Sequence, residues 1–416
     1  MFTRYFPLTP SVWNCQWAAT LNVGRYLCMC FVARANQCAE THPARWRRKM
    51  NRASIMISLA LACGITSANE PAYKVDVIAK GLEHPWTVAF LRDDLLLITE
   101  RPGRLRVIDR DGLREQPVGG LPEVFASGQG GLFDVLPAKD FETSQHIYIS
   151  YAHGNKDANH TRVIRARFDG YQLHDVTPIF TSQPAKSGDA HFGGRMAWMS
   201  DGTLMLGLGD GFFFREDAQK LDTHLAKIVR INADGSVPQD NPFVGRSDAL
   251  PEIYSYGHRH VQALVVDHAA GLLYAHEHGP RGGDELNIIE PGRNYGWPLI
   301  TYGRDYSRAA ITPFTELPGM EQPRTHWVPS IAPAGMTLYD GEHFPQWKGN
   351  LFVAALAEKS VRRVVLSADG HPTEQEVLFK ETEQRVRDVR TAPDGSLYLV
   401  TDEPEGQVLR ISSSTT

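Results

Sequence analysis

The stretch DGSLYLVTDEPEGQVLRIS, residues 394–412, contains the repeated unit that decides the fold. An Asp-Gly pair opens a short apolar run that ends at Thr401-Asp402, and a second run, Gln407–Ser412, follows after a short polar turn. Short runs of β-branched and aromatic residues bounded by Gly, Pro and Asp are typical of strands joined in a hairpin. The stretch therefore predicts two neighbouring antiparallel strands.

The same pair of strands recurs along the chain, so that six units follow one another at roughly 45 to 80 residues. The other five first runs are Leu95–Glu100, His146–Ala152, Gly202–Asp210, Gly271–His278 and Gly349–Leu356, and their second runs are Arg104–Asp109, Arg162–Asp169, Ala226–Ala233, Glu285–Glu290 and Ser360–Ser367.

This spacing matches propeller blades, and the longer intervals imply loop insertions in the third to fifth blades. We predict an all-β protein, a six-bladed β-propeller of four-stranded antiparallel blades over residues 73–412. The early strand Tyr73–Ala79 has no neighbouring partner, and we expect it to join the last blade and close the ring. A pair of β-sandwiches is the competing architecture, but it needs two sets of seven or more short strands rather than six units.

Composition excludes several classes of protein. The formal net charge is −5 with both signs well mixed, so no nucleic-acid partner is expected. All five cysteines lie at or before Cys63, which leaves the body without a disulfide framework or thiol chemistry.

The N-terminal region predicts export. Residues 50–68 combine Arg52, the apolar run Ile55–Ile65 and a small-residue exit at Ala68, the pattern of a secretory signal peptide. The run is too short for stable membrane insertion. We interpret residues 1–49 as an upstream extension or a misassigned start, and Cys63 leaves lipidation open. The protein is therefore expected to be periplasmic or secreted.

A second informative stretch, HEHGPRGGDELNIIEPGRNYGWP at residues 276–298, predicts a cation site. Gly279-Pro280 offers backbone carbonyls, and Asp284 and Glu285 offer the hard oxygen ligands that calcium prefers. We expect it to form the inner hairpin of the fourth blade. An ordinary acidic turn is the alternative.

Three residues suggest catalysis. His191 lies between glycine-rich turns and is a candidate general base, and Asp210 is placed to orient its ring. Arg259 is a permanent cation that can stabilise developing negative charge. A structural histidine and a structural ion pair remain the alternatives.

Further side chains suggest ligand binding. Gln129 places an amide on a glycine-rich turn. Arg385 and Arg387 alternate along a strand, so their guanidinium groups share a face and suit a ligand with several carboxylates. An exposed polar strand face is the alternative.

Taken in order, these motifs resemble the soluble PQQ-dependent sugar dehydrogenases, most closely the aldose sugar dehydrogenase branch, which also includes glucose/sorbosone dehydrogenase-like proteins. The resemblance runs from about Tyr73 to Ser412. The matching motifs are Gly128–Leu132, His191–Arg195, Gly257–Arg259, Gly279-Pro280, Asp284-Glu285, Asn294–Pro298, Pro329–Pro333 and Arg385–Asp388.

The resemblance implies calcium-bound PQQ as cofactor and an aldose sugar as substrate, oxidised at the anomeric carbon to a lactone by hydride transfer. His191 would remove the anomeric hydroxyl proton, Asp210 would hold His191, and Arg259 would stabilise the quinone oxygen. The implied cofactor-binding side chains are Gln129, His191, Arg259, His260, Asp284, Lys359, Arg385 and Arg387. The implied calcium ligands are the carbonyls of Gly279 and Pro280 for a calcium next to PQQ, and Glu285 and the Tyr295 carbonyl for a second, structural calcium.

The chain departs from the family pattern at three positions. His260 replaces an asparagine, Ala357 replaces a lysine whose role Lys359 is expected to take, and Trp327 is one residue out of register for an aromatic that stacks on the quinone. A calcium-dependent lactonase-type propeller and a non-enzymatic carbohydrate- or protein-binding propeller are the alternative functions. Because no haem-attachment motif is present, a diffusible electron acceptor is expected, and the protein would be a monomer or a homodimer.

Overall fold

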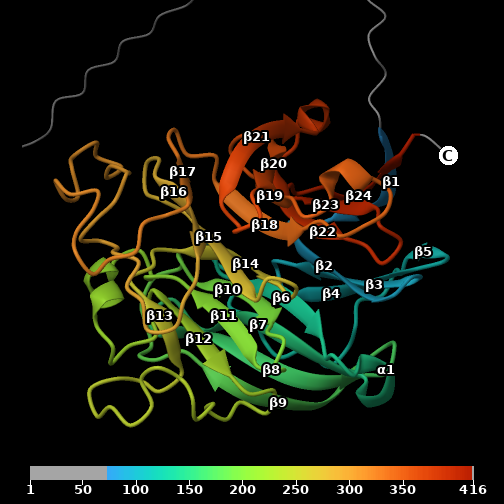
Figure 1. The fold of residues 1–416 in the computed structure, drawn as a ribbon. Coiled ribbons are helices and arrows are strands. Elements are labelled where there is room, and N and C mark those ends of the chain that lie inside the picture. Colours follow the sequence, from blue (N-terminus) through green and yellow to red (C-terminus); the bar gives the residue numbers. More distant parts are fainter. Residues whose placement is uncertain (1–72, 415–416) are drawn as a thin grey trace, which may run out of the picture. The chain divides into compact units, whose positions relative to one another are not determined.

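A computed structural model describes residues 73–414, and the predicted signal, Cys63 and upstream extension lie outside them. Twenty-four strands form six antiparallel sheets of four strands each, which confirms the predicted six-bladed propeller (Figure 1). Within the described part of the chain, no helix is long and apolar enough to cross a membrane.

Five blades are built from consecutive strands. The first blade contains β2 (Pro85–Arg92), β3 (Leu95–Glu100), β4 (Arg104–Asp109) and β5 (Gly112–Leu113), and the second contains β6 (Leu132–Pro137), β7 (His146–Gly154), β8 (Asn159–Phe168) and β9 (Leu173–Thr181). The third blade contains β10 (Gly193–Trp198), β11 (Leu204–Leu208), β12 (Lys227–Ile231) and β13 (Ile253–Tyr256), and the fourth contains β14 (Val261–Asp267), β15 (Leu272–Glu277), β16 (Asp284–Ile288) and β17 (Thr325–Trp327). The fifth blade contains β18 (Pro333–Leu338), β19 (Leu351–Ala355), β20 (Ser360–Leu366) and β21 (Pro372–Leu378). The helical segments are α1 (Phe141–Ser144), η1 (Arg215–Gln219), η2 (Pro345–Trp347) and η3 (Lys380–Thr382).

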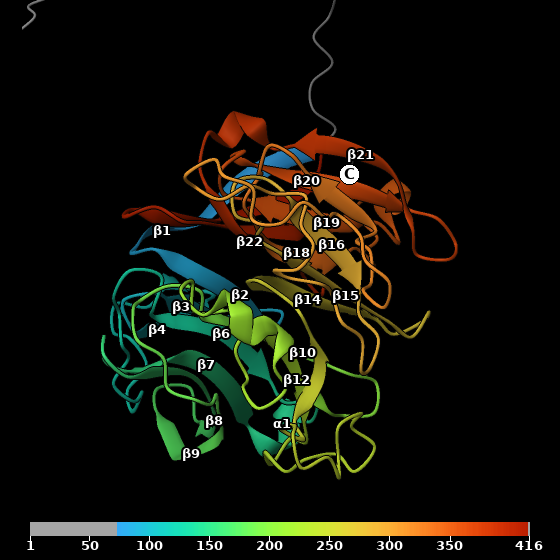
Figure 2. The same cartoon turned by 90° about the vertical axis from the view of Figure 1, so that its left-hand side faces the viewer.

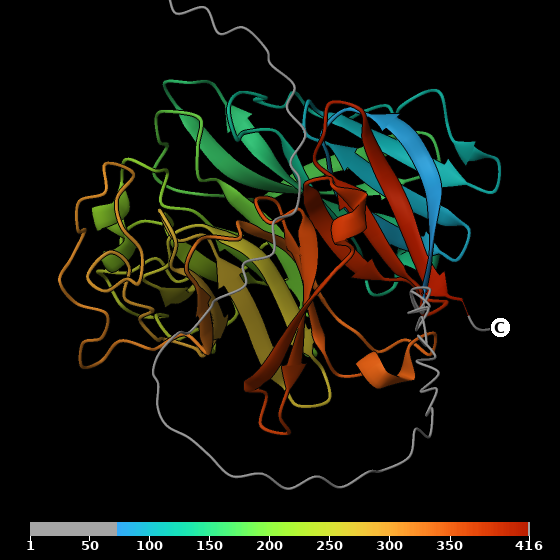
Figure 3. The same ribbon diagram turned by 90° about the horizontal axis from the view of Figure 1, so that it is seen from above.

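The sixth blade closes the ring as predicted. It contains β22 (Val386–Thr391), β23 (Leu397–Thr401), β24 (Gly406–Ser413) and, as its outer strand, β1 (Tyr73–Leu82). β1 pairs antiparallel with β24, with Tyr73 opposite Ser413, and the blue first strand lies against the red last strand (Figure 3). Pairing the two ends of the chain leaves no blade incomplete.

The innermost strands surround the central axis. The first strands of neighbouring blades, β2, β6, β10, β14, β18 and β22, contact one another around the ring. Four consecutive residues at the start of β6, β10, β14 and β18 are all buried, so these strands lack an alternating pattern. Hence the hairpins recognised in the sequence are the second and third strands of each blade. The expectation that residues 276–298 form an inner hairpin was wrong, because they connect β15 to β16 and continue beyond it.

Long connections extend on one side of the third and fourth blades. They follow β11, β12 and β16, and the last of them, drawn in orange, spans residues 289–324 (Figures 1 and 2). The connections after β11 and β16 bring side chains of distant sequence together at the candidate site.

Candidate active site and cofactor pocket

A pocket of about 440 Å³ opens at one end of the inner strands. Four residues predicted to bind a cofactor line it: Gln129, His260, Arg385 and Arg387. Other lining residues, not anticipated from the sequence, are Trp86, Arg101, Gln262 and Asp402.

His191 and Asp210 form a buried pair beside this pocket. The His191 Nδ1 atom lies 2.6 Å from Asp210 Oδ1, and the two residues are 3% and 1% exposed. Only Gly209 separates Asp210 from the end of β11, and this glycine allows the close approach: a Cβ there would lie 2.2 Å from the His191 carbonyl oxygen. The His191 backbone N–H also donates to Gln129 Oε1 at 2.9 Å. The predicted pairing of His191 with Asp210 is thus present in the structure.

Asp210 is held by three donors. Oδ1 accepts from His191 and from the backbone N–H of Phe212 at 2.8 Å, while Oδ2 accepts from Trp297 Nε1 at 2.9 Å. Burial alone would raise the pKa of Asp210, but the hydrogen bond with His191 and the nearby charge of Arg259 hold it below its usual value. A charged carboxylate only accepts, so the proton of His191 sits on Nδ1.

The other ring nitrogen of His191 is therefore an acceptor. Burial lowers the pKa of His191 despite the neighbouring carboxylate, so the ring is neutral near pH 7. No residue of the segment 73–414 hydrogen-bonds its Nε2 atom. A neutral imidazole with one nitrogen anchored and the other free has the form of a general base.

Arg259 and His260 enclose the base from the fourth blade. Arg259 Nη1 donates to the carbonyls of His278 at 3.0 Å and Gly279 at 2.7 Å, and its guanidinium lies 5.3 Å from the Trp297 ring centroid. The His260 ring stacks on His191, with centroids 4.5 Å apart and planes at 16°.

Arg385 and Arg387 share one face of the last blade, as predicted. Their guanidinium groups lie 3.5 and 2.7 Å from the Asp402 carboxylate. Burial would raise the pKa of Asp402, but these cations hold it well below its usual range. With Arg101 also in the wall, the guanidinium groups outnumber the carboxylates Asp402 and Glu403, so the pocket suits an anionic ligand.

The stretch 276–298 forms a small cavity of about 10 Å³ next to this pocket. Gly279, Glu277, Glu285 and Tyr295 line it, and Glu277 and Glu285 are opposite each other on β15 and β16. Burial, and then repulsion from Glu277, raise the pKa of Glu285 to about 8. Two facing carboxyl groups beside backbone carbonyls fit a hard cation of about the volume of one water. Pro280 lies instead in an adjoining cavity of about 300 Å³ with Asp210 and Phe212.

Among residues 73–414, no group of three or more His, Cys, Asp or Glu side chains converges on one metal position. A calcium site here would therefore depend on backbone carbonyls, as the sequence prediction already required.

Four predicted cofactor contacts are not among the pocket-lining residues: His191 and Arg259, which lie beside the pocket, and Asp284 and Lys359. Asp284 is fully buried, and its carboxylate accepts from Gly279 N–H at 2.9 Å, Ser330 Oγ at 2.7 Å and Ile331 N–H at 2.9 Å, so it organises loops. Lys359 is exposed, because β19 ends at Ala355 and the next four residues form a turn. The strand-register argument that placed Lys359 in the site was therefore wrong.

Trp327 does not line the pocket either. It lies on β17, the outer strand of the fourth blade, and its Nε1 donates to Gln375 at 2.9 Å. Trp86 on the innermost strand β2 is the tryptophan in the pocket wall.

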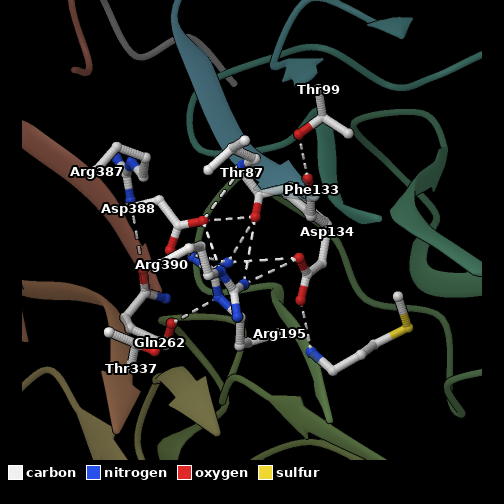
Figure 4. Close-up of polar contacts among 12 residues, drawn as sticks. Thr87, Thr99, Phe133, Asp134, Arg195, Gln262, Thr337, Arg387, Asp388 and Arg390 are labelled. Atoms are coloured by element: carbon white, nitrogen blue, oxygen red, sulfur yellow. Dashed lines mark hydrogen bonds and ion pairs between the residues drawn. The ribbon is translucent and has the colours of Figure 1, made fainter. Parts of the chain in front are cut away.

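A largely buried cluster of charges joins three inner strands, with Asp134 on β6, Arg195 on β10, and Asp388 and Arg390 on β22 (Figure 4). Arg195 lies 3.4 Å from both Asp134 and Asp388, and Arg390 lies 3.4 and 3.0 Å from the same carboxylates. Along β22, Arg387 lines the pocket, Asp388 belongs to the cluster, and Arg390 borders a second cavity of about 520 Å³. The cluster therefore separates the two ends of the channel, and the second cavity contains none of the predicted site residues.

Lys186 is another buried residue near the base that the sequence did not reveal. It is 4% exposed, and its Nζ lies 3.7 Å from the Phe192 ring centroid. Burial lowers the pKa of Lys186 to about 8, although the charges of Asp189 and Asp210 oppose that shift.

The fold and site together define a class, that of six-bladed propellers with a buried His–Asp pair beside an arginine-lined pocket. The Glucose / Sorbosone dehydrogenase family model matches residues 82–410, and the chain belongs to this family.

The relatives agree in length and fold. Aldose sugar dehydrogenase YliI of Escherichia coli (strain K12) is 41% identical over 345 residues, covering 81% of this chain and 92% of that protein. A crystal structure of a glucose dehydrogenase is 45% identical with a TM-score of 0.80, covering 82% of this chain and 100% of that one. The PQQ-bound aldose sugar dehydrogenase of Streptomyces coelicolor is 28% identical with a TM-score of 0.67, covering 82% and 99%.

Proposed function

We propose that the protein oxidises aldose sugars at the anomeric carbon to lactones, with PQQ in the 440 Å³ pocket and calcium beside it. The observation that carries this proposal is the buried His191–Asp210 pair, 2.6 Å apart, next to a pocket lined by Arg385 and Arg387. The family membership supports the same reaction.

The side chains present fit the cofactor. PQQ carries three carboxylates, and Arg101, Arg385 and Arg387 supply cations around the pocket. Two buried donors in this wall, His260 Nδ1 and Arg387 Nε, lack a partner among the described residues. The carbonyls of Gly279 and Pro280 would hold a calcium that would act as a Lewis acid, and Glu285 and the Tyr295 carbonyl would hold a second, structural calcium.

When bound, PQQ supplies the two-electron acceptor that takes hydride from the anomeric carbon. His191 Nε2 takes the proton of the anomeric hydroxyl as the carbon–oxygen double bond forms. Asp210 stabilises the resulting imidazolium through Nδ1–H, and Trp297 keeps Asp210 in place. Arg259 supplies positive charge next to the reacting atoms.

The setting follows from the N-terminal region. The predicted signal at residues 50–68 places the mature protein in the periplasm or outside the cell, where a diffusible acceptor would reoxidise the cofactor.

The ion pairs at the centre of the propeller argue against a lactonase-type hydrolase. Such an enzyme would need free carboxylates around a central cation. Asp134 and Asp388 do lie at the axis, but Arg195 and Arg390 already pair with both.

The test is reconstitution of the purified protein with PQQ and calcium. We expect aldose to bleach the absorbance of the oxidised quinone, and His191→Ala to lower the rate at least ~100-fold. His174→Ala is the matched control, because His174 also pairs with a carboxylate at 2.7 Å but is 38% exposed and remote from the pocket. Turnover of His191→Ala equal to that of the control would refute the assignment, and a wild type without spectral change would support a non-enzymatic propeller.

A further inference from the structure

His260 occupies a wall position where its two ring nitrogens have different surroundings. The residue is 6% exposed and lines the pocket. Its Nε2 atom lies 3.0 Å from the side-chain nitrogen of Gln262, whereas Nδ1 is buried with no partner among the described residues. A Cβ on Gly209 would lie 2.9 Å from the His260 Cδ2 atom, so Nδ1, on the other side of the ring, faces away from that backbone.

Two contacts fix the orientation of the Gln262 amide. Its oxygen accepts from Arg387 Nη1 at 3.5 Å, and arginine can only donate. Its nitrogen lies 3.2 Å from the Val261 carbonyl oxygen, which can only accept. Exchanging oxygen and nitrogen would oppose donor to donor and acceptor to acceptor, so the NH₂ group faces His260.

Gln262 and Arg387 are themselves anchored. The Gln262 carbonyl accepts from Arg195 Nε at 3.2 Å, which ties its backbone to the central charge cluster (Figure 4). Arg387 Nη2 is held by Asp402 at 2.7 Å. Anchored contacts on both sides therefore hold the Gln262 amide in one orientation.

The orientation of the Gln262 amide determines which ring nitrogen of His260 carries the proton. Burial, and then the neighbouring imidazole of His191, keep the pKa of His260 well below its usual value, so the ring is neutral. In a neutral imidazole that accepts at Nε2, the single proton is on Nδ1.

We propose that Gln262, oriented by Arg387, is a positioning residue that fixes His260 as the Nδ1–H tautomer, so that His260 donates a hydrogen bond to an oxygen acceptor of the ligand in the pocket. The identity of that ligand as PQQ, whose carbonyl and carboxylate oxygens are acceptors, rests on the proposed function. Because the His260 ring stacks on the His191 ring, with centroids 4.5 Å apart, the contacts that hold His260 also support the ring of the base.

The first experiment reads the tautomer in the protein without ligand. Long-range ¹H–¹⁵N spectra of ¹⁵N-histidine-labelled protein distinguish the two tautomers, and the His260→Asn variant identifies the signal of His260. We expect the Nδ1–H form in the wild type and a mixture in Gln262→Leu. In Gln262→Glu, whose carboxylate accepts from the ring, the Nε2–H form should dominate.

The second experiment measures PQQ binding by quenching of tryptophan fluorescence, without turnover. Loss of a donor to a buried acceptor should weaken binding about tenfold in Gln262→Leu. In the His260→Asn background, Gln262→Leu should alter PQQ affinity less than about twofold, because an asparagine carries a hydrogen-bond donor whether or not Gln262 is present. Asn350→Leu is the matched control, since Asn350 Oδ1 also accepts from an arginine, Arg363 at 2.9 Å, but within residues 73–414 its amide is hydrogen-bonded to no histidine and does not line the pocket.

An unchanged tautomer in Gln262→Leu, or an equal tenfold loss in the Asn background, would overturn the inference. Gln262→Met provides a second apolar substitute if Gln262→Leu does not fold. Failure of the wild type to bind PQQ would instead count against the proposed function, and the tautomer measurement in the ligand-free protein would still decide the inference.

Discussion

Replacing Asp210 by asparagine tests how the catalytic pair is built. The carboxylate accepts three hydrogen bonds, from His191 and Phe212 on Oδ1 and from Trp297 on Oδ2. Asparagine has one acceptor oxygen and one NH₂ group in the same space. If its oxygen faces His191, the NH₂ group opposes Trp297 Nε1–H; if it faces Trp297, the NH₂ group faces His191 and favours the wrong tautomer.

Either orientation leaves a buried donor without an acceptor, which costs about 1–3 kcal/mol of stability. With a total stability of at least about 5 kcal/mol, such a loss still leaves about 97% of the protein folded. The second orientation also places the proton on His191 Nε2 and removes the base, so kcat/KM should fall by about 10²- to 10⁴-fold. A fall of that size cannot come from unfolding.

The rescue variant is Trp297→Phe, because it removes the donor that opposes the asparagine NH₂ group. The double variant should therefore oxidise aldose faster than Asp210→Asn alone, although Trp297→Phe by itself weakens the support of Asp210. The assay is aldose-dependent reduction of a dye by protein saturated with PQQ and calcium, with urea unfolding measured in parallel. Wild-type kcat/KM in Asp210→Asn, or additive losses in the double variant, would refute the reasoning.

Three further outcomes follow from the electrostatics. Asp388→Asn should lose about 3–5 kcal/mol of unfolding free energy, measured in urea, because it removes one of the two carboxylates that balance the charges of Arg195 and Arg390. Asp394→Asn, at a half-exposed ion pair of the same blade, should lose about 0–1 kcal/mol. Equal losses in the two variants would contradict a stabilising role of the central charge cluster. Activity should fall as pH decreases through the pKa of His191, which lies below its usual value, so an acid limb of kcat/KM centred above pH 7 would contradict the neutral base. Without calcium, Glu285 has a higher pKa in the folded protein than in the unfolded chain. Its contribution to stability is therefore greatest at pH values below the unfolded-chain pKa and is lost as pH rises through about 8. Calcium should therefore raise the thermal midpoint more at pH 8.5 than at pH 6, an effect absent in Glu285→Gln, and a pH-independent shift would argue against that site.

The fold could be predicted because its repeat is local. Each recognised hairpin begins with a short apolar run, most of these runs follow a Gly or Asp turn, and both features are visible in a single sequence. The innermost strands were harder to recognise, because buried polar residues interrupt their apolar runs, such as Asp134 in β6, Arg195 in β10 and Gln262 in β14. Outer strands such as β5, two residues long, carry too little pattern to be recognised.

The site could be predicted only where chemistry is concentrated in short motifs. His191 and Asp210 are 19 residues apart and flank the hairpin of β10 and β11, so their pairing followed from one blade. The contact between Gln262 and Arg387 joins residues 125 apart on different blades. The Lys359 prediction failed for a related reason, since a strand register says nothing about where the strand ends.

The departure at His260 shows why such distant contacts matter for function. An asparagine side chain always carries a donor, but a neutral histidine donates from only one of its two nitrogens. A histidine at this position can present a donor to the pocket only if something else selects its tautomer. Gln262 makes that selection, and its own orientation depends on Arg387 across the channel. The effect of a histidine at position 260 therefore depends on Gln262 and Arg387, whereas an asparagine at that position would present a donor without them.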